Sequence, residues 1–181
     1  MRVLGVDPGS NATGFGLIER IGGVIRHLSH GVLRPPAGAP LADRLHFLHR
    51  ELLAILTREA PEIAVVERIF VAANPRSALV LGQARGALLA SLGAAGIRVA
   101  EISARGVKKA VTGSGAADKA QMRTMVARLL SLDPAPPSDA ADALALAFTY
   151  AGAGPMAELP IRSRRRNTRR ATTQFVLGRI R

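Results

Sequence analysis

Four acidic residues lie near the ends of apolar segments, where carboxylates could hold divalent metal ions. Asp7 ends the segment RVLGVD and Glu67 ends the segment IAVVE. Asp139 and Asp142 are three positions apart in SDAADALALAF, so a helix would place them on one face. Carboxylates gathered in one place repel one another, and a divalent cation removes this repulsion. Oxygen ligands without Cys or His nearby suit Mg²⁺ or Mn²⁺.

Two such ions, about 4 Å apart, can activate a water molecule and stabilise the leaving oxygen of a phosphodiester. The four acids therefore indicate metal-dependent phosphodiester hydrolysis with two ions in each active site. Three of the acids also have an ordinary explanation when taken alone, and only Asp142 is explained less well in this way. Asp7 could form a turn, Glu67 could pair with a cation, and Asp139 suits the first turn of a helix.

The elements that must position these acids can be predicted from turn signals and hydrophobic periodicity. The patterns predict strands at 2–7, 13–20, 24–33, 63–67 and 97–102, and helices at 41–58, 75–92, 104–111, 118–131 and 138–150. The first three strands form an antiparallel meander. A right-handed crossover can place strand 63–67 parallel to strand 2–7, with Asp7 and Glu67 at the same edge of the sheet. We expect an α/β fold with a five-stranded mixed sheet flanked by helices.

The charge of the chain favours a polyanionic partner. The 181 residues carry 25 Lys and Arg against 13 Asp and Glu, a formal net charge of +12. Residues 1–150 have 17 basic and 12 acidic groups, and residues 151–181 have 8 arginines and one glutamate. Nucleic acid is favoured over a membrane surface because no basic amphipathic helix stands out. A merely soluble basic protein remains the alternative on charge alone.

Composition also bounds the organisation of the chain. There is no cysteine, no long apolar run that could span a membrane and no export signal at the start, so we expect a cytoplasmic protein. Residues 1–152 are expected to form one nuclease domain, and residues 153–181 a basic, disordered tail.

Three segments, taken in order, carry a family resemblance. GVDPGSNATGFG, VVERIF followed by NPRSALVLGQARG, and SDAADALALA resemble the signatures of RuvC-type Holliday-junction endonucleases, of the ribonuclease-H-like superfamily. The similarity covers about residues 1–150. It implies a homodimer that cuts two strands of a four-way DNA junction symmetrically during recombination and repair, in cooperation with the RuvA and RuvB branch-migration proteins. By position, Asp7, Glu67, Asp139 and Asp142 match the family's metal-binding catalytic tetrad.

Five further residues are candidates for DNA contacts. Phe70, just past Glu67, is either a core side chain or an apolar wedge that stacks on a base near the exchange point, and the resemblance favours the wedge. Arg76 could reach a phosphate or remain solvated. Lys108, Lys109 and Lys119 are the only lysines, and Lys108 and Lys119 match basic positions that the family uses for DNA.

Small residues recur every fourth position on the helix predicted at 75–92. They are Ala78, Gly82, Gly86 and Ala90. Glycine inside a helix costs about 1 kcal/mol relative to alanine. We therefore expect these small residues to allow close packing against another element. That element could be a helix of a second subunit or the chain's own sheet.

Three other functions are compatible with parts of the sequence. A related ribonuclease-H-like nuclease acting on RNA would use the same acids. An ATPase of the actin or sugar-kinase type shares the DPG turn but normally needs two such lobes. A non-catalytic nucleic-acid-binding protein would explain the charge but leave the four acids unexplained.

Overall fold

The computed structural model describes residues 1–68 and 75–153. Its strands are β1 (Arg2–Asp7), β2 (Thr13–Ile21), β3 (Val24–Leu33), β4 (Ile63–Arg68) and β5 (Arg98–Ser103). Its helices are α1 (Leu41–Glu59), α2 (Pro75–Ala94), α3 (Ala104–Thr112), α4 (Lys119–Leu129) and α5 (Ser138–Gly152). Each predicted element is present, with ends no more than two residues from the predicted ones.

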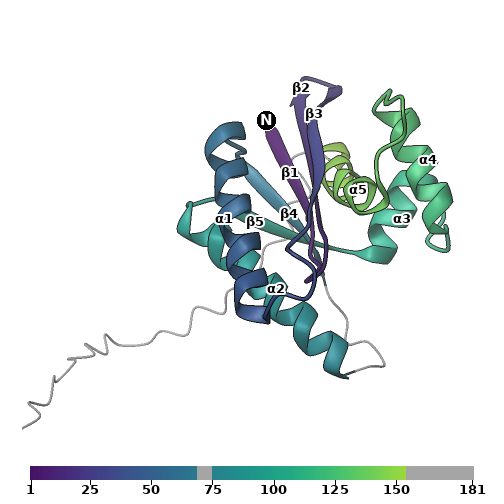
Figure 1. The fold of residues 1–181 in the computed structure, drawn as a ribbon. Helices are drawn as coiled ribbons and strands as arrows, with labels where there is room; N and C mark the ends of the chain where they lie inside the picture. The colour runs from purple at the N-terminus through teal and green to yellow at the C-terminus, as the bar shows by residue number, and fades with distance from the viewer. Residues whose placement is uncertain (69–74, 154–181) are drawn as a thin grey trace, which may run out of the picture.

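The strands form one mixed sheet in the order β3-β2-β1-β4-β5 (Figure 1). β1 and β3 pair with β2 in antiparallel orientation, which confirms the predicted meander. β4 lies parallel to β1 on one side and to β5 on the other. The predicted parallel pairing of β4 with β1 is therefore confirmed, and β1, β4 and β5 all end at the same edge of the sheet.

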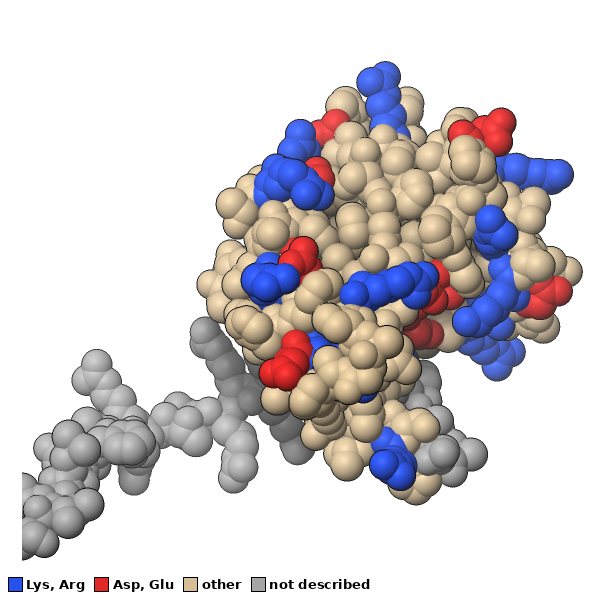
Figure 2. Space-filling view, in the orientation of Figure 1, with Lys and Arg blue, Asp and Glu red and all other residues tan. Residues whose placement is uncertain are grey.

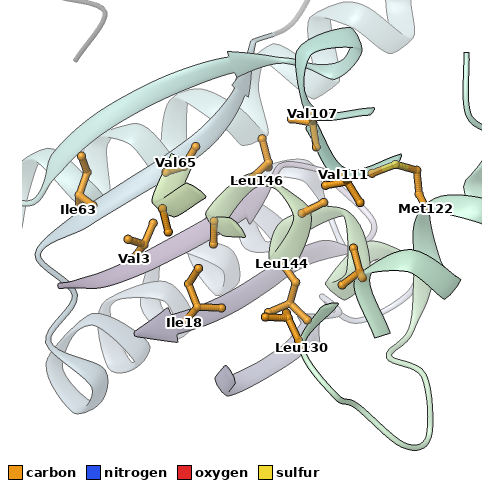
Figure 3. Close-up of a cluster of buried hydrophobic side chains, with 14 of the residues drawn as sticks. Val3, Ile18, Ile63, Val65, Val107, Val111, Met122, Leu130, Leu144 and Leu146 are labelled. Atoms are coloured by element: carbon orange, nitrogen blue, oxygen red, sulfur yellow. The ribbon is translucent and has the colours of Figure 1, made fainter. Parts of the chain in front are cut away.

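Helices cover both faces of the sheet and bury a core on each. α1 and α2 lie on one face, and α3, α4 and α5 lie on the other (Figure 1). Successive strand residues point to opposite faces, so Val3 belongs to the core under α3–α5 and Leu4 to the core under α1 and α2. Figure 3 shows the first of these cores, with labels on Val3, Ile18, Ile63, Val65, Val107, Val111, Met122, Leu130, Leu144 and Leu146.

Glycines on β1 and β2 let α5 lie very close to the sheet. A Cβ atom added to Gly5 on β1 would be 1.8 Å from the backbone oxygen of Ala143. A Cβ added to Gly14 on β2 would be 1.9 Å from the backbone oxygen of Asp139. Glycine is therefore required at both positions, and this approach carries the acids of α5 to the edge where β1 ends.

Within residues 1–68 and 75–153, no helix is long and apolar enough to cross a membrane. Basic and acidic side chains are both spread over the face seen in Figure 2 rather than separated into two large patches. Phe70 and, apart from Ala153, the tail predicted at 153–181 lie outside the described residues.

Candidate active site

Two of the predicted acids extend from neighbouring parallel strands. Val6 of β1 pairs with Val66 of β4, so Asp7 and Glu67, the next residue of each strand, lie at the same edge of the sheet. Val6 and Val66 are fully buried, whereas the two acids are only partly buried. Apolar side chains thus anchor the strands, and the carboxylates stand where the core ends.

A pocket of about 280 Å³ opens beside these acids, on the face covered by α3, α4 and α5. α5 contributes Asp142, α3 contributes Lys108 and α4 contributes Lys119. Apolar groups complete the lining: Ala104, Val107, Met122 and Leu146. Three carboxylates and two ammonium groups from five elements therefore share one concave site.

Asp139 occupies a different position from the other three acids. It does not line the pocket, and its carboxylate lies 3.7 Å from the guanidinium of Arg34, in an ion pair with Oδ2. Its side chain is 34% exposed. Its charge nevertheless acts on Asp7 and Asp142, raising the pKa of both, so it lies near the pocket.

The electrostatics of the pocket make an ionised Asp7 unfavourable. Burial is the largest cause, and the negative charges of Asp142, Glu67 and Asp139 add to it. Lys119 acts in the opposite direction. Together these effects raise the pKa of Asp7 to about 7, so ionisation of this carboxyl group is opposed unless a cation is bound.

The pKa values of Glu67 and Asp142, the two other acids that line the pocket, are shifted by similar causes. Burial is the main cause that raises the pKa of Glu67, followed by the charge of Asp142. Burial also raises the pKa of Asp142. In both cases Lys119 and Lys108 lower the pKa, so the lysines partly offset the repulsion among the acids.

The donor set of the pocket suits a hard divalent cation. Its lining offers carboxylate oxygens and neither Cys nor His, which fits Mg²⁺ or Mn²⁺ better than a softer metal. Within the described part of the chain, no three acidic, His or Cys side chains converge as the ligands of a single ion. Mg²⁺ usually retains several waters and binds one or two carboxylates together with substrate phosphates, so the spread of these acids is compatible with it.

The three lysines have different surroundings. Lys108 is partly buried at the pocket, and Lys119 is exposed at its rim as the first residue of α4. A capping box between Asp118 and Gln121 fixes the start of that helix. Lys109 is exposed and does not line the pocket.

Sequence reasoning missed an ion-pair network behind Glu67. Arg85 of α2 donates from Nε to the backbone oxygen of Glu67, at 3.4 Å, and pairs with Glu101 of β5. Arg68 lies 3.9 Å from the same Glu101 carboxylate. The sequence of α2 contained a signal for this network. Arg85 is the one charged residue in the interior of that helix, whose only other charged residue is Arg76 near its start.

The small residues of α2 do not pack on the chain's own sheet, so that alternative is wrong. Gly82 and Gly86 are exposed, and a Cβ atom added to either would meet nothing within 4 Å. Leu79 on the same helix is 65% exposed. Arg76 lines a second pocket on the α1 and α2 face of the sheet rather than the pocket of the acids.

Comparisons with known proteins agree with this geometry. The family described as "Crossover junction endodeoxyribonuclease RuvC" matches residues 3–150. A protein of that name from Alkalilimnicola ehrlichii is 49% identical over 149 residues, which are 82% of this chain and 90% of the relative.

Solved structures give the same result. T. thermophilus RuvC in complex with Holliday junction substrate has a TM-score of 0.79 at 35% identity, covering 86% of this chain and 96% of that one. The yeast mitochondrial Holliday junction resolvase has a TM-score of 0.60 at 14% identity, covering 83% and 78% of the two chains, which shows the fold alone. The expected ribonuclease-H-like fold is confirmed.

Proposed function

The chain belongs to the RuvC family of crossover junction endodeoxyribonucleases, and we propose that it resolves four-way Holliday junctions with divalent ions held by its pocket carboxylates. Membership makes it an endonuclease of DNA recombination and repair. The observation that supports the proposed chemistry is the gathering of Asp7, Glu67 and Asp142 with two lysines in one pocket. Neither an RNA nuclease nor a non-catalytic binding protein is favoured by these relatives.

We propose Asp7, Glu67, Asp139 and Asp142 as the metal-binding catalytic residues, with two Mg²⁺ ions per site and Mn²⁺ as a substitute. Bound ions of this kind activate a water and stabilise the leaving oxygen of the cut phosphodiester. The raised pKa of Asp7 supports the assignment, because a cation is what returns such a carboxyl group to its ionised form.

The basic side chains would hold the phosphate that the acids repel. Lys108 and Lys119, at the pocket, are placed to attract the DNA backbone and to orient the phosphate to be cut. Lys109 would add affinity without touching the reacting group, and Arg76 would contact the backbone elsewhere. For Phe70 the proposal rests on sequence alone: it would act as the wedge that stacks on a base near the exchange point.

A homodimer would supply two active sites for paired cuts. The exposed stripe on α2 supports this arrangement, because small residues permit another helix to approach closely and Leu79 adds apolar surface beside them. By family membership we also propose cooperation with RuvA and RuvB and a cytoplasmic location. Residues 1–152 would form the nuclease domain, and residues 153–181 a separate basic tail.

Cleavage of a synthetic four-way junction tests the function. The wild type and Asp7→Asn are compared on the junction, on a linear duplex of the same sequence and on an RNA–DNA hybrid, with Mg²⁺, Mn²⁺ or chelator. We expect paired, metal-dependent nicks in the junction only, and loss of cleavage with retained binding in Asp7→Asn. Junction binding without cleavage by the wild type, or preferred cleavage of the hybrid, would contradict the proposal.

A further inference from the structure

A second pocket lies at the same edge of the sheet as the active site but on the opposite face. It has a volume of about 350 Å³. Ser10 and Asn11 line it from the turn that follows Asp7, and the remaining lining residues come from α1 and α2. They are Arg44, Arg76, Ser77, Val80 and Leu81. β1 thus leads into two pockets, one on each face.

Arg44 is held in place by the turn itself. Its Nε donates to the backbone oxygen of Ser10 at 3.0 Å, and its Nη2 donates to Oδ1 of Asn11 at 2.6 Å. The turn is fixed in its own right, since the buried Thr13 donates from Oγ1 to the backbone oxygen of Gly9 at 2.8 Å. A guanidinium has more N–H groups than these two bonds use. Arg44 can therefore bind a ligand with little further loss of side-chain freedom.

The charge of this pocket is opposite to that of the active site. Two arginines line it and no carboxylate does, whereas three carboxylates line the active-site pocket. The hydroxyl group of Ser10 adds a donor. Guanidinium groups bind phosphate through parallel hydrogen bonds, so the chemistry favours a phosphate and disfavours a metal ion.

We propose that this second pocket binds a backbone phosphate of the DNA other than the one that is cut. The inference rests on the proposed function for the identity of the DNA, and on the pocket's own residues for its preference for phosphate. A strand held at both pockets would cross the edge of the sheet where β1 ends. Arg44 then has two roles: it donates hydrogen bonds to the turn after Asp7, and it anchors the DNA backbone.

Ser77→Asp and Arg44→Gln test this proposal separately. Asp is favourable in the first turn of α2, so Ser77→Asp is compatible with the helix while it places a negative charge in the pocket. Thr57→Asp is the matched control: it makes the same charge change at an exposed position about 20 Å along α1 from Arg44. Fluorescence anisotropy with the full chain and a labelled four-way junction, in chelator over a series of salt concentrations, gives the affinities.

We expect both pocket variants to bind the junction about tenfold or more weakly than Thr57→Asp at low salt. The slope of log affinity against log salt should fall by about one for Arg44→Gln. The proposal would be overturned if Ser77→Asp and Thr57→Asp had equal junction affinities and equal salt slopes. This holds even if Arg44→Gln alone bound the junction weakly, because Arg44 would then act only through the turn. These readouts need no cleavage, so a wild type that binds junctions without cutting them would refute the proposed function and leave this test intact.

Discussion

Replacing Asp7 by Asn should stabilise the metal-free protein while it removes cleavage. An ionised Asp7 faces burial and three other acids, and these surroundings raise its pKa from the ordinary 3.8 to about 7. The amide of Asn carries no charge and has nearly the same shape. The substitution therefore removes an unfavourable charge and leaves the packing of β1 unchanged.

The size of the effect follows from the shift in the pKa. At about 1.4 kcal/mol per pKa unit, a change from 3.8 to about 7 corresponds to at most about 4 kcal/mol. The pocket is open to solvent, which screens part of this energy, so we expect about 2 kcal/mol. For a chain of this size that is a rise of about 4–8 °C in Tm.

The sign depends on pH. The folded pKa lies above the unfolded value, so the folded state loses stability as the pH rises from about 4 to about 7 and reaches a constant penalty above that range. Thermal unfolding in chelator at about pH 8 should therefore show Asp7→Asn as the more stable protein, and at about pH 4 the difference should vanish. Adding Mg²⁺ should raise the Tm of the wild type more than that of the variant.

Asp43→Asn is the matched control for this experiment. Asp43 is exposed in the first turn of α1, where its charge is favourable, so its loss should lower stability by about 0.3–1 kcal/mol. The reasoning would be refuted if Asp7→Asn were no more stable than the wild type at about pH 8 without metal. A gain of the same size at every pH would also refute it, because titration of Asp7 would not be its cause.

Three further substitutions test other parts of the site. Lys119→Gln removes a charge that lowers the pKa of the pocket carboxylates, so the acidic limb of the profile of cleavage rate against pH should move to higher pH; an unmoved limb would count against this role. Gly5→Ala would place a Cβ atom 1.8 Å from a backbone oxygen of α5. It should lower the free energy of unfolding, measured by urea titration, by about 1–3 kcal/mol. Gly23→Ala is the control: its added Cβ meets nothing within 4 Å, so it should leave the free energy of unfolding unchanged. Arg85→Gln breaks the ion pair with Glu101 and the hydrogen bond to the backbone oxygen of Glu67. We expect the rate of single-turnover cleavage to fall by a larger factor than the affinity for the junction. An equal loss in both would indicate a general folding defect.

The type and order of the elements could be predicted from the sequence because their signals are local. A short apolar run marked β1, and Pro or Gly marked the turns between elements. The position of Asp7 and Glu67 at one edge also followed from the sequence, since a right-handed crossover leaves little choice for the strand after α1. The motifs around these acids carried the family resemblance.

Only the tertiary structure decided how the charged groups divide around the two pockets. Spacing placed Asp139 and Asp142 on one helical face, yet Asp142 lines the active-site pocket and Asp139 pairs with Arg34, more than a hundred residues away in the chain. Arg44 binds the turn after β1, and Arg85 joins α2 to the strands behind Glu67. Such contacts join distant parts of the chain, and they depend on how helices pack on a sheet, which a local pattern of residues does not contain.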